Sequence, residues 1–116
     1  MNKPTLKSLT QAELEAISNR FKVELTALYG DQLAKLILFG SYARGDYSTY
    51  SDVDYLVVLN QNSVQFGPEV DKISLISSDL GLDYTVHVSA KPVSVSDYNL
   101  SNRLFYQAIR SEGILI

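Results

Sequence analysis

Hydrophobic residues recur at steps of three and four near the start of the chain and predict a first helix. Thr10 and Glu13 have the spacing of a capping box, which marks a helix N-terminus. Gly30 is a natural helix end because glycine adopts the left-handed conformation without strain. The apolar face between these signals comprises Leu14, Ile17, Phe21, Leu25 and Leu28.

Two short, continuously apolar runs, 36–39 and 53–59, predict strands buried on both faces. Pro68 suits the first turn of a following helix, and Gly81 ends its apolar pattern. The remaining expected elements are a helix over 68–80 with Val70, Ile73, Ile76 and Leu80 inward, a strand over Asp83–Val88, a loop over 91–99, and a helix over 101–111 with Leu104, Phe105, Ala108 and Ile109 inward.

This order of elements predicts an α/β (α+β) fold, with a small mixed sheet flanked by helices. A strand–helix–strand unit forms a right-handed crossover, so the second and third strands are expected to be parallel. The first strand is expected to run antiparallel to the second. With 116 residues the chain is expected to form one domain, 1–116.

Composition narrows the possible functions. Ten Lys and Arg against 13 Asp and Glu give a net charge of −3, with the basic residues scattered, so no long nucleic acid is expected as a partner. The chain has no cysteine, which excludes disulfides and thiolate metal sites. No apolar run approaches the roughly 20 residues of a membrane span, and the N-terminus lacks the apolar core of a signal peptide. A cytoplasmic protein without membrane association is expected.

The segment GSYARGDYSTYSDVDYLVVL raises the question of function, because it places two aspartates, Asp52 and Asp54, at the start of a strand that is expected to be buried. Residues two apart in a strand share a face, so the two carboxylates are expected to project together. Asp83, before the third strand, would face them, and Gly40-Ser41 would reach the same edge of the sheet. The alternative is ordinary turn chemistry: Ser-Asp before a strand, and a glycine that ends one.

Carboxylates gathered at one place repel each other unless a cation neutralises them. Hard oxygen ligands suit Mg²⁺, which takes one or two carboxylates together with waters and substrate phosphates. Two such ions form the clamp used in phosphoryl and nucleotidyl transfer. Gly40 would allow close approach of a phosphate, Ser41 offers a hydroxyl, and Arg44 adds a fixed positive charge for an anionic substrate.

Gly40-Ser41, a spacer, and then Asp52-x-Asp54 on the next strand resemble the signature of the DNA-polymerase-β-like nucleotidyltransferases, in their minimal MNT-type branch. Either dipeptide pattern alone is weak, whereas the two at this spacing, between apolar strands, are specific. The resemblance covers 36–59 strongly and the rest of the chain through the order of its elements.

The resemblance implies residue roles. Gly40, Ser41, Arg44 and Ser51 would contact the nucleotide, and Asp52, Asp54 and Asp83 would be the catalytic, metal-binding carboxylates for two Mg²⁺ ions, with Asp83 helping to take a proton. Asp83 is the weakest member, because its local pattern is not diagnostic and Asp71 and Asp79 are alternatives, better explained as exposed helix positions.

The resemblance also implies a reaction and a partner. The chain would move AMP from ATP to a hydroxyl, namely a tyrosine of a HEPN-domain toxin, as the antitoxin of a toxin–antitoxin pair. One alternative is a non-catalytic antitoxin that neutralises by contact. The other is transfer to a small-molecule hydroxyl, which the absence of an acceptor domain disfavours.

Two other sets of residues invite functional readings. His87, the single histidine, is expected to be a structural strand residue without a catalytic role. Four tyrosines near the motif are candidates for stacking on a base, or are ordinary loop and strand residues: Tyr42, Tyr47, Tyr50 and Tyr55.

Overall fold

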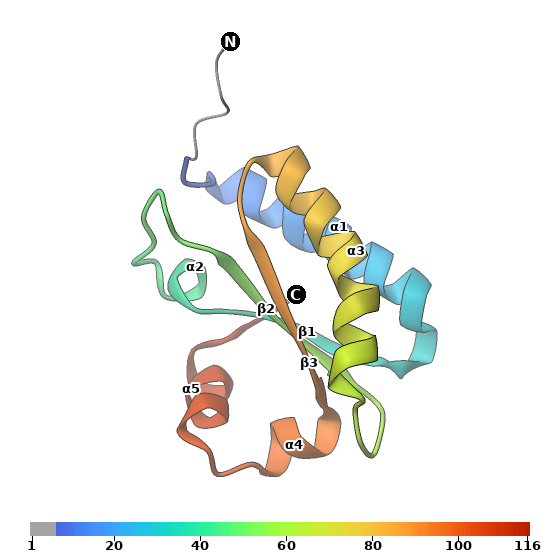
Figure 1. Ribbon diagram of the computed structural model, residues 1–116. Coiled ribbons are helices and arrows are strands. Elements are labelled where there is room, and N and C mark those ends of the chain that lie inside the picture. The colour runs from blue at the N-terminus through green and yellow to red at the C-terminus, as the bar shows by residue number, and fades with distance from the viewer. Residues whose placement is uncertain (1–6) are drawn as a thin grey trace.

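The computed structural model describes residues 7–116, which form a four-stranded sheet with helices on both faces (Figure 1). The first six residues, part of the N-terminal segment in which no signal peptide was expected, lie outside the described region. The elements in chain order are α1 (Gln11–Tyr29), the 3₁₀ turn η1 (Gly30–Gln32), β1 (Leu33–Phe39), α2 (Ser41–Arg44), β2 (Val53–Leu59), α3 (Phe66–Tyr84), β3 (Val88–Ser94), α4 (Val95–Leu100), α5 (Leu104–Glu112) and β4 (Ile114–Leu115).

Helix α1 begins and ends as its sequence predicts. The Thr10 hydroxyl accepts the Glu13 N–H at 3.1 Å, and the Glu13 carboxylate accepts the Thr10 N–H at 3.0 Å. These two bonds satisfy amide groups that have no partner within the helix. Gly30 follows the helix with a φ of +56°, a conformation that favours glycine.

The sheet has the strand order β3-β2-β1-β4. Strands β1 and β2 are antiparallel, and β2 and β3 are parallel, as predicted. The short C-terminal strand β4 pairs antiparallel with the outer side of β1. The expected mixed α/β fold is therefore confirmed.

Alternating residues of the sheet enter two separate apolar clusters. Val53 and Tyr55 of β2 pack under α1 and α3, whereas Leu56 and Val58 pack against the α4–α5 side. Figure 1 shows the same division, with α1 and α3 crossing one face of the sheet and α4 and α5 lying over the other. Side chains of β2 at even-numbered positions thus face α4 and α5.

The third strand is the main error of the sequence prediction. Asp83 lies in the last turn of α3, and the strand begins only at Val88. Gly81 does not end the helix: Thr85 does, with a left-handed φ of 54°, and its N–H bonds back to the Gly81 carbonyl. Gly81 is instead needed for packing, because an added Cβ would lie 2.7 Å from the Val86 carbonyl oxygen.

The expected loop over 91–99 is also wrong, since β3 continues to Ser94 and α4 follows directly. Pro92 suggested a loop, but β3 is an edge strand, where a residue without an N–H is tolerated. Helix α5 was placed correctly to within a few residues. Of its expected inward face only Ile109 is buried, whereas Leu104 is 82% exposed and Tyr106, which was not expected, is buried.

Within residues 7–116, no helix has the length and apolar character needed to cross a membrane.

The buried hydrogen bond between the Ser18 and Tyr55 hydroxyls, 2.7 Å long, ties α1 to β2 under the sheet. Tyr55→Phe leaves the Ser18 hydroxyl without its partner, so we expect a loss of about 1–2 kcal/mol in the free energy of unfolding. The Tyr55→Phe, Ser18→Ala double variant leaves no orphaned group, so it should lose less than the sum of the two single changes. Urea denaturation of the four proteins measures this coupling. Strict additivity would show that the bond contributes nothing.

Candidate functional site

Gly40 and Asp54 are in direct contact where β1 and β2 meet. Phe39, the last residue of β1, pairs with Asp54 of β2, so Gly40 follows next to the Asp54 carboxylate. A Cβ added to Gly40 would overlap Oδ2 of Asp54. The backbone of Gly40 has φ +76° and ψ −156°, a region that only glycine occupies readily. The antiparallel pairing therefore brings the Gly-Ser and Asp-x-Asp segments together.

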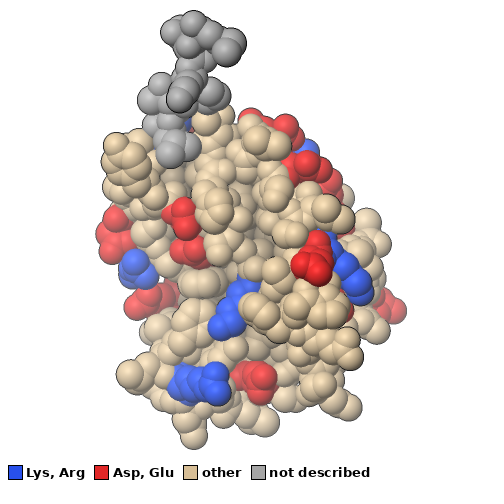
Figure 2. Space-filling model, viewed as in Figure 1, with Lys and Arg blue, Asp and Glu red and all other residues tan. Residues whose placement is uncertain are grey.

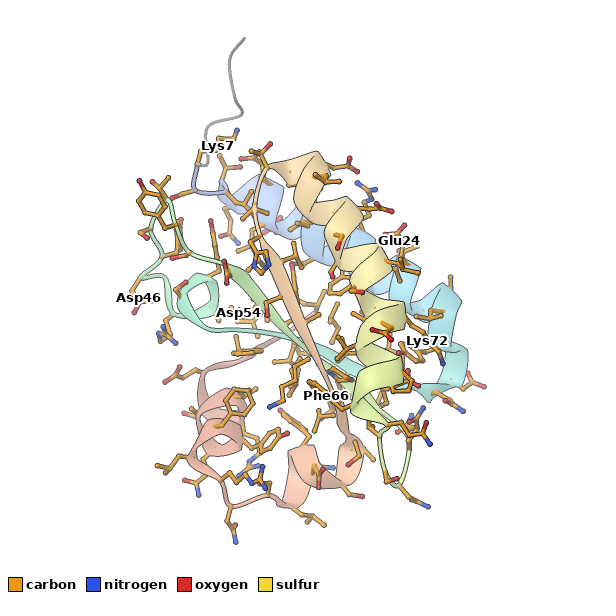
Figure 3. The ribbon with its side chains drawn as sticks, in the orientation of Figure 1. Lys7, Glu24, Asp46, Asp54, Phe66 and Lys72 are labelled. Carbon is orange, nitrogen blue, oxygen red and sulfur yellow. The ribbon has the colours of Figure 1, made fainter. Side chains whose placement is uncertain are left out.

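Asp52 and Asp54 project to the α4–α5 side of the sheet. Val53 between them is fully buried under α1 and α3, and side chains alternate along a strand. Asp52 is half-exposed and Asp54 is partly buried. Figure 3 shows Asp54 on β2 beside α2, with Asp46 on the loop beyond that helix.

The charge on Asp54 is disfavoured where it stands. Partial burial raises the pKa of Asp54 above its ordinary value, and the neighbouring charge of Asp52 raises it further. Protonated His87 and Arg44 would each oppose this shift in the pKa of Asp54 but do not cancel it. The site thus holds two carboxylates whose joint ionisation costs free energy until a cation is bound.

The predicted nucleotide-contacting residues have different surroundings. Arg44 is the last residue of α2. Its Nε lies 3.2 Å from Asp46 Oδ2, and its Nη1 lies 3.6 Å from Oε2 of Glu112 at the end of α5. The Ser51 hydroxyl accepts the Ser48 N–H at 2.8 Å and so stabilises the turn that leads into β2. Ser41 is half-buried at the start of α2.

Asp83 belongs to the other layer of the molecule. Its Oδ2 lies 2.6 Å from Arg20 Nη1, which joins the end of α3 to α1. Asp52 and Asp54 face the opposite side of the sheet, so the strand geometry from which a role for Asp83 was predicted does not exist. The alternatives, Asp71 and Asp79, are exposed positions on α3.

The side chain beside Asp52 is His87, whose Nδ1 lies 3.2 Å from Oδ1 of Asp52. Residues 87, 89 and 91 are exposed and alternate with the buried Val88 and Pro92, so His87, Ser89 and Lys91 line one face of β3. Lys91 extends over the Phe105 ring, with Nζ 4.6 Å from the centroid. The sequence pattern did not reveal this strip, because the alternation over Asp83–Val88 predicts a third strand that begins five residues before β3.

The four tyrosines divide clearly. Tyr55 is fully buried beneath the sheet and cannot meet a base. Tyr42 is buried and stacks on Tyr47, with ring centroids 4.4 Å apart and 10° between planes. Tyr50 is 84% exposed. The buried Tyr42 thus supports the exposed Tyr47 of the motif loop.

The donor chemistry of the site fits Mg²⁺ bound together with a nucleotide. Among the described residues, no three His, Cys, Asp or Glu side chains are arranged to hold a metal ion by themselves. Two partly exposed carboxylates remain, which is the number Mg²⁺ commonly takes when waters and phosphate oxygens complete its shell. The positive charge of a bound ion would also relieve the repulsion between Asp52 and Asp54.

On the face shown in Figure 2, acidic and basic side chains are interspersed, and no continuous basic surface forms there. Such a surface suits a small ligand that brings its own counter-ions better than a long polyanion.

Comparison with known proteins decides the family. The profile of the nucleotidyltransferase domain matches residues 18–108, which include the motif and all three long strands. The chain belongs to this family. It is a nucleotidyltransferase, and the resemblance noted from Gly40-Ser41 and Asp52-x-Asp54 is confirmed.

Two Methanocaldococcus jannaschii proteins, each named a putative protein adenylyltransferase, are similar in sequence. MJ0141 is 39% identical over 77 residues, covering 66% of this chain and 76% of its own. MJ0604 is 35% identical over 100 residues, covering 85% of this chain and 93% of its own.

Solved structures share the fold. A toxin–antitoxin structure with AMP-PNP superposes with a TM-score of 0.57 at 17% identity, covering 82% of this chain and 68% of that one. A point mutant of the MntA-HpeT toxin–antitoxin superposes at 0.56 with 16% identity, covering 94% and 72%. At these identities the likeness concerns the fold alone.

Gly40→Ala tests the contact between the two motif segments. The added methyl group meets both backbone strain, of order 1–3 kcal/mol, and the Asp54 carboxylate, so we expect lower thermal stability together with loss of divalent-ion binding. Gly45→Ala is the matched control: Gly45 also has a positive φ, +87°, but open space around its Cβ position. It should lose stability while binding ions normally. Equal ion binding by both variants would show that the Gly40–Asp54 contact does not position the carboxylate.

Asp54→Asn tests the electrostatic strain at the site. Because the folded state raises the pKa of Asp54, it holds the proton more tightly than the unfolded state, and wild-type stability falls as pH rises through that raised value. The Asp54→Asn variant does not lose stability in this way, so without divalent ions its melting temperature at neutral pH should be about 1–4 °C above that of wild type. At low pH, where both side chains are neutral, the two melting temperatures should be equal. Melting curves across pH with Asp71→Asn as control measure it, and a lower melting temperature at neutral pH would contradict the interpretation.

Proposed function

We propose that this nucleotidyltransferase moves AMP from ATP to a protein hydroxyl, namely a tyrosine of a partner toxin of the HEPN class. The observation that carries the proposal is the contact of Gly40 with Asp54 beside Asp52. Through this contact, the glycine that would leave room for a phosphate lies next to the carboxylates that would bind Mg²⁺. Two further findings support it. Similar proteins are named as protein adenylyltransferases, and the fold recurs in toxin–antitoxin complexes, one of them with AMP-PNP.

In the proposed reaction, the acceptor hydroxyl oxygen attacks the α-phosphorus of ATP. The bond from that phosphorus to the bridging oxygen breaks, pyrophosphate leaves, and the hydroxyl proton passes to solvent. Mg²⁺, when bound, supplies Lewis-acid stabilisation of the charge on the phosphates. Asp52 and Asp54 would hold the ion at the N-terminal end of β2, and the small Gly40 would leave room for the phosphate beside them.

The remaining residues of the chain act by position. The Tyr42–Tyr47 stack and the Ser48–Ser51 turn fix the loop between the two motif segments. Arg44, already balanced by Asp46 and Glu112, is a fixed cation at the border of the site. A rigid arrangement of this kind accelerates transfer by holding the reacting groups in line.

The test is transfer of label from ATP radiolabelled on its α-phosphate, with Mg²⁺ and the protein encoded by the adjacent gene. Label on the partner from α-labelled but not γ-labelled ATP identifies adenylylation rather than phosphorylation. Asp52→Ala and Asp54→Ala should each reduce transfer by on the order of 10²-fold or more, because each removes electrostatic stabilisation at the phosphates. Partner labelling that survives both changes would refute the assignment of these carboxylates.

Asp83→Asn separates the Asp52–Asp54 pair from the third predicted carboxylate. Because Asp83 pairs with Arg20 on the other side of the sheet, we expect transfer by this variant to stay within about threefold of wild type. If Asp83→Asn loses as much transfer as Asp52→Ala, Asp83 takes part in the reaction and our expectation is wrong. Binding and inhibition of the partner without any label, by wild type and the Asp52→Ala variant alike, would instead indicate a non-catalytic antitoxin.

A further inference from the structure

His87 stands beside Asp52 because of the register between β2 and β3. Val53 pairs with Val88 and Asp54 with Ser89, so the residue before β3 lies next to the residue before β2. The Val53 N–H donates to the His87 carbonyl oxygen at 2.9 Å, which fixes this placement through the backbone. The imidazole and the carboxylate therefore meet as a consequence of sheet pairing.

Asp52 has less support from its own strand than Asp54 has. Asp54 is inside the β1–β2 ladder, partly buried and packed against Gly40. Asp52 precedes β2, follows a turn, and has a side chain that is 48% exposed. An exposed aspartate at such a position samples several rotamers unless another group restrains it. His87 is in a position to restrain it, because its Nδ1 lies 3.2 Å from Oδ1 of Asp52.

We propose that His87 is a positioning residue, whose Nδ1–H donates to Oδ1 of Asp52 and leaves Oδ2 available to bind a divalent ion. The proposal rests on the proposed function, because it concerns the same ion site. A group that hydrogen-bonds a metal-binding carboxylate fixes its orientation, and removing such a group typically weakens metal binding 10–100-fold. Both the Nδ1–H neutral tautomer and the imidazolium form donate this bond. The role therefore requires no change of charge on His87.

Each carboxylate then has its own support. Gly40 holds Asp54 through close packing from β1, and His87 holds Asp52 through a hydrogen bond from β3.

The experiment measures Mn²⁺ binding by electron paramagnetic resonance, in the presence of a non-hydrolysable ATP analogue. His87→Ala removes the donor and should weaken Mn²⁺ binding about 10-fold or more. His87→Asn retains an N–H near the position of Nδ1 and should bind Mn²⁺ within about threefold of wild type. Arg20→Ala is the control, because it breaks a comparably exposed ion pair on the other side of the sheet and should leave Mn²⁺ binding unchanged. Melting curves establish that all variants are folded.

Two results would overturn the proposal: Mn²⁺ binding by His87→Ala equal to wild type, or His87→Asn as weak as His87→Ala. The failure of the proposed function looks different. If wild type with the nucleotide analogue binds no Mn²⁺, the ion site itself is refuted, and His87 has no carboxylate to position. If wild type binds Mn²⁺ and labels its partner while His87→Ala binds equally well, only the role of His87 fails.

Discussion

The antiparallel pairing of β1 with β2 is the interaction on which the rest of the site depends. It places Phe39 opposite Asp54 and so brings the end of one strand to the start of the next across a 13-residue connection. A one-residue slip in this register would turn Asp54 into the core and Val53 out to solvent. Because Val53, Tyr55 and Val57 are all fully buried, such a slip would cost many apolar contacts. The hydrophobic core therefore sets the positions of Asp52 and Asp54.

Local signals allowed much of this to be predicted. The capping box of Thr10 and Glu13, the apolar runs before Gly40 and after Asp54, and the motif itself lie within short segments, so the elements around them follow from nearby residues. The third strand did not follow, because Asp83–Val88 alternates like a strand while α3 extends through it to Tyr84. Packing between distant segments favours the helix here, because Ile73 and Leu80 of α3 are buried in the cluster on the α1–α3 side of the sheet.

That error explains why Asp83 was predicted and His87 was not. Because β3 begins five residues later than predicted, His87 and not Asp83 lies beside Asp52. Asp83 lies instead on the side of the sheet covered by α1. The alternation within Asp83–Val88 fits either arrangement, and the register that places His87 beside Asp52 is set by pairing with the distant strand β2. Register between strands is a tertiary property, so a single sequence specifies motif residues far better than the neighbours that surround them.

The separation of the two apolar clusters has a consequence for how the protein tolerates change. The cluster on the α1–α3 side contains Ile17, Phe21 and Leu25, whose contribution is close packing in the core. Substitutions there should therefore alter how much folded protein a cell maintains. On the opposite side, the same sheet carries a second apolar cluster and, at the start of β2, the carboxylates of Asp52 and Asp54. In a mutational survey that records abundance and nucleotidyl transfer separately, we expect positions in both clusters to change abundance, and positions around Asp52 and Asp54 to change transfer without changing abundance.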